Sequence, residues 1–214
     1  VDRKKIISDL LSDQARIANS ILPPESWAYA VGNEYPYDPE KARQLLKEAG
    51  YTNQEIVFKY SSGNYYVNNY SHVIQSSLSD VGLNVRIETL ERNTIVEQLA
   101  KGQVQMFTGI WVGGNQAPLF LRDLFSSTKI PGPVVGCCNR SRYMNPDVDR
   151  VLAQAVDAID RETAKSLYAE AQRTVSNELP LFPLWYPANI VVANKRINNI
   201  KISGSGDWSF LKEV

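Results

Sequence analysis

The sequence predicts an α/β fold in which a mixed sheet is flanked by helices, and two observations carry this prediction. Three times in the first half, an amphipathic helical pattern ends at a glycine and an apolar or alternating run typical of a strand follows. Strands that alternate with helices in this way are joined by crossovers. In addition, the apolar run 104–111 leads into a glycine-bearing loop, as expected where a strand ends at a ligand.

The chain begins with a helical pattern, and the first helix–glycine–strand unit follows it. Residues 1–7 resemble a helix entered at its cap without an initiator methionine, which predicts a fragment of a longer protein. Further on, Asp38 suits an N-cap, Pro39 suits the first helical position, and Gly50 suits the left-handed residue that ends a helix. One face of this helix is apolar and consists of Ala42, Leu45, Leu46 and Ala49. A strand is predicted at 56–60.

The second and third units repeat this plan. A helix is predicted over 65–82, with Gly82 as its cap, followed by an alternating strand at 83–89. The apolar positions with helical spacing are Tyr66, Val67, Tyr70, Val73, Ile74, Leu78 and Val81. A third helix is predicted over 93–102, and it leads into a buried strand at 104–111.

The second half changes to paired helices, for which Asn145 and Asp160 are the predicted N-caps. The apolar faces are Val148, Val151, Leu152, Ala155, Val156 and Ile159 in the first helix and Ala164, Leu167, Tyr168, Ala171 and Val175 in the second. Two short strands are predicted at 181–185 and 189–193. Because no linker or repeat interrupts the pattern, we expect residues 1–214 to form a single ligand-binding lobe.

Composition excludes several classes of function. The 23 basic residues balance the 23 acidic residues, whereas a nucleic-acid-binding surface needs a basic excess or a clustered basic patch. No apolar run approaches the roughly 20 residues that a membrane span requires. The two cysteines, Cys137 and Cys138, are adjacent, and a disulfide between neighbours is strained and rare. We therefore expect two thiols, of which one pairs outside this chain.

The sequence offers no catalytic constellation. The lone histidine, His72, lies within a helical pattern, and one histidine cannot build the usual zinc motifs. Asp147 and Asp149 are two positions apart on a helix, so they do not face each other. We expect no catalytic residue, no metal and no cofactor, and an enzyme remains an alternative only if a further part of the protein brings the chemistry.

Binding is the remaining function, and the end of the 104–111 run is its predicted place. Trp111 ends this run beside glycines, where backbone can approach a ligand closely. Trp111 could therefore face a ligand, or it could pack against Phe120 and Phe125. The predicted ligand-binding residues are Trp111, Gly113, Gly114 and Asn115.

Several stretches, taken in order, resemble the family 5 extracellular solute-binding proteins, which are the oligopeptide, dipeptide and nickel receptors of ABC importers. They are Asp2-Arg3-Lys4-Lys5-Ile6-Ile7, Tyr37-Asp38-Pro39-Glu40-Lys41-Ala42 with its continuation to Tyr51, the segments 74–85 and 102–111, Tyr143-Met144-Asn145-Pro146-Asp147-Val148-Asp149, Leu167-Tyr168-Ala169-Glu170-Ala171-Gln172 and Pro180-Leu181-Phe182-Pro183-Leu184. The match is specific because of their order and spacing, and it covers nearly the whole chain.

The resemblance implies one lobe of a two-lobed, periplasmic-binding-protein-like (type II) fold that encloses a peptide or other small solute. It implies an ABC transporter permease as partner, no cofactor, and a periplasmic or extracellular location, with membrane contact only through the transporter or a lipid anchor. A peptide-sensing or chaperone-like receptor without a transport role is the alternative.

The loop after Trp111 departs from the pattern of the family. Peptide-binding members carry an aspartate near the amino group of the ligand, and the matching position here is Gly114. Ala117 also precedes Pro118, where an acid is usual. Because an ammonium buried without a carboxylate is costly, we expect a neutral or larger ligand, or a counter-charge from the other lobe.

Overall fold

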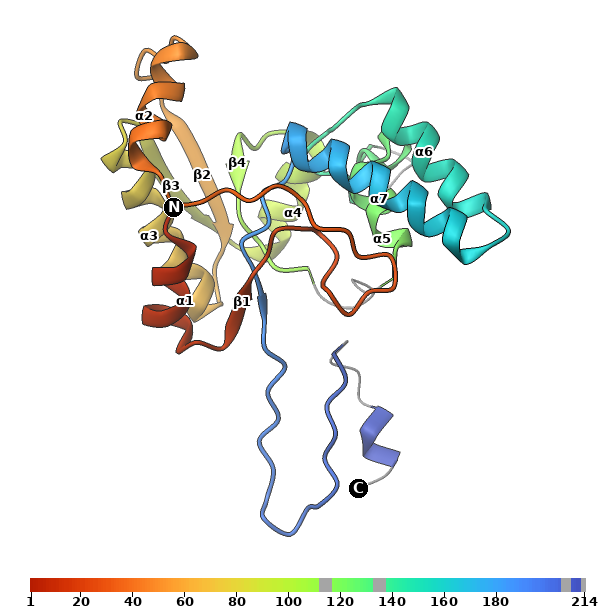
Figure 1. Cartoon of the computed structure of the whole chain (residues 1–214). Coiled ribbons are helices and arrows are strands. Elements are labelled where there is room, and N and C mark those ends of the chain that lie inside the picture. Colours follow the sequence, from red (N-terminus) through yellow and green to blue (C-terminus); the bar gives the residue numbers. More distant parts are fainter. Residues whose placement is uncertain (112–116, 133–137, 205–208, 213–214) are drawn as a thin grey trace. The chain divides into compact units, whose positions relative to one another are not determined.

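The computed structural model describes residues 1–111, 117–132, 138–204 and 209–212 (Figure 1). The chain divides into two compact units. The sheet unit comprises Val1–Gln14, Glu34–Ile110 and Ile130–Arg142, and the helical unit comprises Ala15–Asn33, Trp111–Lys129 and Tyr143–Val214. Each unit is described by itself, and the single lobe over residues 1–214 stays a prediction.

The sheet unit is built on a parallel three-stranded sheet and not on the predicted mixed sheet, because the antiparallel pairing of the described residues lies in a separate two-stranded sheet. Its strands are β2 (Ile56–Ser61), β3 (Val85–Leu90) and β4 (Met106–Phe107), in the order β3-β2-β4. Its helices are α1 (Arg3–Leu11), α2 (Pro39–Glu48), α3 (Tyr65–Asp80) and α4 (Arg92–Lys101). Helices α3 and α4 are the crossovers that parallel pairing requires, so the predicted α/β fold class is confirmed (Figure 1).

Helix boundaries in this unit follow the predicted caps. The Asp2 carboxylate accepts a hydrogen bond from the backbone N–H of Lys5 at 3.0 Å, and that of Asp38 accepts one from Lys41 at 2.8 Å. Gly50, after α2, has φ +64°, the left-handed conformation that glycine adopts without a steric cost. The predicted beginnings of α1 and α2 are therefore confirmed.

The two faces of β2 have different roles. Phe58 and Tyr60 are buried, and the Tyr60 hydroxyl donates to Asn68 of α3 at 2.6 Å. Lys59, which points to the opposite face, reaches Gln98 of α4. Helices α3 and α4 thus cover opposite faces of the sheet.

The apolar helical patterns are only partly buried. In α3, Val67, Tyr70 and Ile74 enter the core, whereas Tyr66 is 55% exposed and Val73 is 38% exposed. Helix α2 has its predicted apolar face but contributes no buried residue. The spacing therefore identifies the helices correctly but overstates which apolar side chains reach the core.

The predicted buried strand at 104–111 is wrong in extent and in burial. Strand β4 covers only Met106 and Phe107, both half-buried. Just before it, the backbone N–H of Val57 in β2 donates to the side-chain oxygen of Gln105 at 2.8 Å. The Gln105 side-chain oxygen thus takes the place of a backbone carbonyl that would accept this hydrogen bond in a longer strand. The pairing of β2 with β4 is shorter as a result.

The helical unit packs three helices around one apolar core. They are α5 (Leu119–Phe125), α6 (Pro146–Asp157) and α7 (Arg161–Glu178), with the short 3₁₀ segments Ser127–Lys129 and Ser209–Lys212. Leu152 is fully buried, Leu121 is 1% exposed, and Ala28 from the N-terminal part of the unit joins them. The predicted N-caps are confirmed, since Asn145 accepts from Asp147 and Val148 and Asp160 accepts from Thr163.

Two short strands complete the helical unit, and they differ from the predicted pair. β1 (Ala15–Ile17) pairs antiparallel with β5 (Trp185–Pro187). Residues 181–184 precede the strand, and 189–193 form none. The prolines at 183 and 187 explain the displacement, because proline cannot donate to a ladder and is confined to strand edges.

The structure also bears on the expected state of the two cysteines. Cys138 is disulfide-bonded, so the expectation of two thiols is wrong for this residue, and Cys137 lies outside the described residues.

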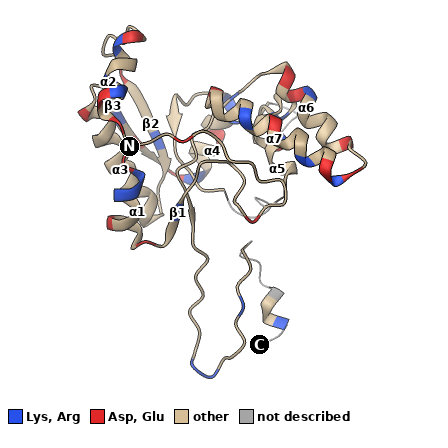
Figure 2. Cartoon of the chain, in the orientation of Figure 1, with Lys and Arg blue, Asp and Glu red and all other residues tan. Residues whose placement is uncertain are grey.

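In the described part of the chain, no helix combines the length and apolar character needed to cross a bilayer. Figure 2 shows basic and acidic residues side by side on α2 and α7, unlike the clustered basic surface of a nucleic-acid-binding protein.

We predict that Leu152→Ala lowers the free energy of unfolding by about 2–5 kcal/mol, because the truncation leaves a cavity in a closed core. Leu45→Ala is the matched control, since Leu45 is 51% exposed on α2 and should change stability by less than about 0.5 kcal/mol. Urea unfolding of both variants measures the difference. Equal losses would contradict the described core.

Candidate functional site

The carboxyl ends of the three parallel strands meet at one edge of the sheet, and this is the candidate binding surface. We call it the carboxyl edge and define it as residues 61–66 after β2, 90–93 after β3 and 108–110 after β4. Ligands of open α/β sheets bind beyond the carboxyl ends of the strands, where connecting loops leave backbone groups and side chains free to meet them. The chain order β2-α3-β3-α4-β4 brings all three segments to this edge.

Local sequence fixes the turn from β2 into α3. Gly63 has φ +91°, a conformation that disfavours every residue with a Cβ. Asn64 follows as the N-cap, and its side chain accepts from the backbone N–H of Val67 at 3.0 Å. The first helical residues, Tyr65 and Tyr66, are therefore held in a defined position.

Large apolar side chains are exposed along the carboxyl edge. Tyr65 is 74% exposed, Tyr66 is 55% exposed, and Ile110 is 52% exposed. The two tyrosine rings contact each other edge to face, with centroids 5.7 Å apart. Sequence analysis missed this pair because it counted Tyr66 on the apolar face of the helix. The adjacent Gly-Asn turn and cap could have shown that both rings precede the buried face.

Trp111 follows the carboxyl edge in the chain but belongs to the helical unit. Its ring is half-buried and contacts Phe120 edge to face, with centroids 5.5 Å apart. Packing against Phe120 is thus observed, and Phe125 packs edge to face with Tyr143. The other predicted ligand-binding residues, Gly113, Gly114 and Asn115, lie outside the described residues. Their role, like that of Trp111, stays a prediction.

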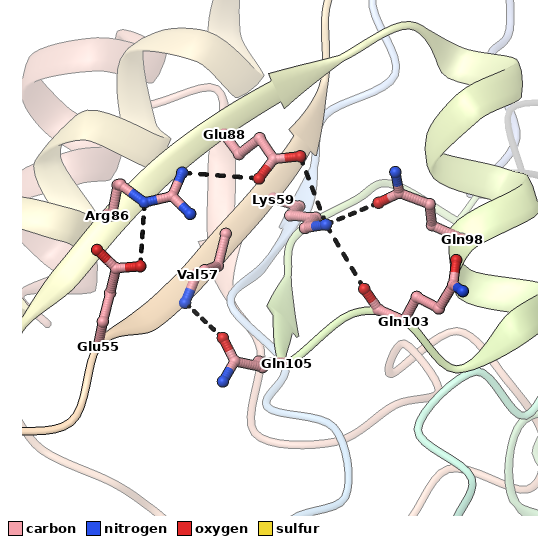
Figure 3. A network of polar contacts seen from close by, with 8 residues as sticks. All are labelled: Glu55, Val57, Lys59, Arg86, Glu88, Gln98, Gln103 and Gln105. Carbon is pink, nitrogen blue, oxygen red and sulfur yellow. Dashed lines mark hydrogen bonds and ion pairs between the residues drawn. The ribbon is translucent and has the colours of Figure 1, made fainter.

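A polar network lies on the α4 face of the sheet (Figure 3). The Lys59 ammonium donates to the side-chain oxygen of Gln98 at 2.7 Å and lies 3.5 Å from a Glu88 carboxylate oxygen. It also reaches the backbone carbonyl of Gln103 at 3.5 Å, and Arg86 continues the network between Glu88 and Glu55. Since Lys59 is only 12% exposed and is satisfied by three partners, the network braces α4 and its exit against the sheet.

A second polar cluster joins the beginning of α6 to the end of α7. The Tyr143 hydroxyl donates to the Glu178 carboxylate at 2.5 Å, and the Asn145 amide donates to the same group at 2.9 Å. Burial raises the pKa of the Tyr143 hydroxyl, and the Glu178 carboxylate raises it further. Tyr143 therefore keeps its proton throughout the neutral range and acts as a structural donor.

Asp147 and Asp149 have separate partners and do not form a carboxylate pair. Asp149 accepts from the backbone N–H and hydroxyl of Ser127, while Asp147 pairs with Arg150 at 3.1 Å. His72 is exposed and lies 3.5 Å from the Tyr60 hydroxyl. Among the described residues, no group of three or more His, Cys, Asp or Glu side chains could hold a metal ion.

These features define a class of protein. A parallel sheet with crossover helices, an accessible carboxyl edge with exposed aromatic rings, and polar clusters that are internally satisfied are typical of a ligand-binding α/β unit. A family model for bacterial extracellular solute-binding proteins, family 5 Middle, matches residues 1–132. The chain belongs to this family of extracellular solute-binding proteins.

Relatives and solved structures agree with this assignment. Heme-binding protein A of Haemophilus influenzae is 29% identical over 98% of this chain and 39% of its own length. Glutathione-binding protein GsiB of Shigella dysenteriae is 31% identical over 98% of this chain and 42% of its own length. The crystal structure of a dipeptide binding protein from Pseudoalteromonas, in complex with Met-Leu, is 28% identical with a TM-score of 0.78, and the match covers 87% of this chain and 38% of that one.

The comparisons confirm the predicted type II periplasmic-binding-protein-like fold, and these relatives are binding proteins. The chain spans about two fifths of the length of the relatives it matches. What the whole protein binds, and with which partners, is therefore a matter for proposal.

We predict that Lys59→Met lowers the free energy of unfolding by about 1–3 kcal/mol, because Gln98 and Glu88 lose a buried donor while the apolar stem is retained. The matched control is Lys101→Met, since Lys101 is 57% exposed and pairs with exposed Glu97. An exposed pair of this kind contributes about 0.2–1 kcal/mol. Denaturant unfolding that gives the two variants the same stability would contradict the bracing role of Lys59.

Proposed function

We propose that this chain is a lobe of the substrate-binding component of an ABC importer that takes up peptides or a related small solute. The observation that carries the proposal is the exposed carboxyl edge of a parallel sheet in a member of solute-binding family 5. A lobe of this kind contributes one wall of a cleft, and the solute is enclosed when a second lobe closes on it.

Exposed apolar residues near the C-terminus support a second lobe. Residues 188–204 form an arm whose two ends are joined by a hydrogen bond from the Asn189 amide to the Gly204 carbonyl at 3.2 Å. The arm exposes Ile190 (63%), Val192 (93%) and Ile197 (44%). An apolar surface of this kind is covered in the intact protein by a partner surface, which we assign to the second lobe.

The solute class follows from the relatives and from the loop after Trp111. Relatives carry names that refer to di/tripeptides, glutathione and haem, all of which are small solutes with carboxylates and apolar groups. With glycine at position 114, the loop offers no acid for an amino terminus. The counter-charge for a peptide ammonium then comes from the second lobe.

The remaining assignments follow from the same role. We assign no catalytic activity to the protein, because its titratable clusters in the described residues act in caps, braces and helix ends. A disulfide at Cys138 favours an oxidising compartment, in keeping with a periplasmic or extracellular receptor. An ABC permease is the macromolecular partner, and any membrane attachment is through it or a lipid anchor.

A thermal-shift screen of the full-length protein against short peptides, glutathione, sugars and metal chelates tests the proposed function. Ligands that bind the native state raise its melting temperature, and the stabilisation grows with the logarithm of ligand concentration over Kd. We expect peptides or glutathione to raise it. Stabilisation by sugars alone, or by no solute of these classes, would contradict the proposal.

We predict that Trp111→Ala in the full-length protein weakens solute binding by about 1–3 kcal/mol, the scale of removing an aromatic anchor. The reason is that a tryptophan ring at the end of the 104–111 run adds apolar contact area for the solute. Calorimetry with the solute found in the screen measures the change. Unchanged affinity in a variant with a normal melting temperature would remove Trp111 from the site.

We also predict that this chain alone binds the same solute at least about a hundredfold more weakly than the full-length protein, because enclosure between two lobes requires both. The measurement is calorimetry on the separate chain after circular dichroism has established that it is folded. Equal affinity in the two proteins would contradict the two-lobed site.

A further inference from the structure

The exposed tyrosine pair at the start of α3 combines a defined backbone position with a contact between its two rings. The side-chain cap of Asn64 and the left-handed turn at Gly63 hold the backbone just before Tyr65. The two rings then support each other edge to face at an interplanar angle of 77°. Since tyrosine has only two side-chain torsions, little conformational entropy is lost when such a pair meets a ligand.

The position of the pair on α3 explains why it is available. The buried face of α3 consists of Val67, Tyr70, Ser71 and Ile74. Tyr65 lies on the opposite side of the first turn, whereas Tyr66, four positions before Tyr70, borders the buried face. Neither ring belongs to the core, since Tyr65 is 74% exposed and Tyr66 is 55% exposed.

The polar ends of the rings are available as well. Within the part of the chain that the structure describes, neither the Tyr65 nor the Tyr66 hydroxyl makes a hydrogen bond to another residue. Each side chain thus presents an apolar ring and a solvent-accessible hydroxyl at the same place. This combination is typical of tyrosines that contact ligands, because the ring buries apolar area while the hydroxyl meets a polar group.

The location of the tyrosine pair indicates which part of the solute it contacts. Tyr65 and Tyr66 follow β2, the central strand, and Ile110 follows its neighbour β4 with 52% of its surface exposed. Apolar groups therefore flank two adjacent strand ends at the carboxyl edge, where the solute is placed in the proposed function. Apolar surface at this edge fits an apolar or aromatic group of the solute, while the backbone of a peptide could meet the hydroxyls.

We infer that Tyr65 and Tyr66 form an aromatic platform that binds an apolar or aromatic side chain of a peptide solute. The inference rests on the proposed function and narrows the solute class to peptides with at least one large apolar side chain. The edge-to-face pair leaves ring faces open, and aromatic side chains prefer edge-to-face or offset contacts with such rings.

The test is calorimetry on the full-length protein with trialanine and with three tripeptides of Ala that carry Phe at the first, second or third position. The variants are Tyr65→Ala and Tyr66→Ala. The matched control is Tyr37→Ala, because Tyr37 is 54% exposed in the same unit but lies before α2, away from the strand ends. Melting temperatures establish that each variant is folded.

We expect the wild type to bind at least one Phe-containing tripeptide more tightly than trialanine. We expect Tyr65→Ala or Tyr66→Ala to lower that affinity roughly tenfold, the scale of a lost aromatic contact, while the affinity for trialanine and the binding of Tyr37→Ala are unchanged.

Four results would overturn the platform. Equal affinities of the wild type for trialanine and for every Phe-containing peptide would show that no apolar side chain is selected. Equal losses for trialanine and Phe-containing peptides in the variants would assign the pair to contact with the second lobe. Wild-type selectivity that survives both substitutions would place the apolar subsite elsewhere and leave the proposed function intact, whereas a wild type that binds no peptide would overturn both.

Discussion

The rest of the sheet unit depends on the parallel pairing of β2 with β3 on one side and β4 on the other. Parallel pairing forces each connection to cross the sheet, so α3 and α4 must cover its faces and all three strands must end at the same edge. Phe58, which is fully buried, and Lys59, which donates to Gln98 of α4, are consecutive residues of β2. Their side chains point to opposite faces of the sheet, where α3 and α4 lie. The candidate binding surface is thus a consequence of strand direction, since parallel strands bring the loops and helix beginnings that follow them to the same edge.

The polar groups of the chain are largely committed to this architecture. Lys59 braces α4 and its exit, Asp149 ties α6 to the 3₁₀ turn before it, and Glu178 joins α7 to the cap of α6 through Tyr143 and Asn145. A charged group that is already satisfied by positioned partners is poorly suited to proton transfer. In the proposed site, recognition therefore rests on shape, aromatic surface and backbone groups, which are the usual means of binding a small solute.

Sequence alone predicted the elements whose signals are local. The caps Asp38, Asn145 and Asp160 and the left-handed Gly50 were predicted correctly, because capping needs only a side chain and its own backbone a few residues away. The length of β4, the β1–β5 pair and the exposure of Tyr66 were not predictable in this way. They depend on which distant segment supplies the hydrogen-bond partner or the covering surface, and periodicity holds no information about that. In the candidate site, the ligand-binding role of Trp111 and the loop after it stays a prediction, whereas the aromatic pair after β2 was found only in the structure.

The central claim is that the solute contacts the carboxyl edge of this sheet. Amide hydrogen exchange on the full-length protein, with and without a bound peptide, tests it most directly because it reports each backbone segment separately. We expect peptide binding to slow exchange at 61–66 and 108–110, with little change in α6 and α7. Protection that spares both strand ends and appears only in α6 and α7 would contradict it.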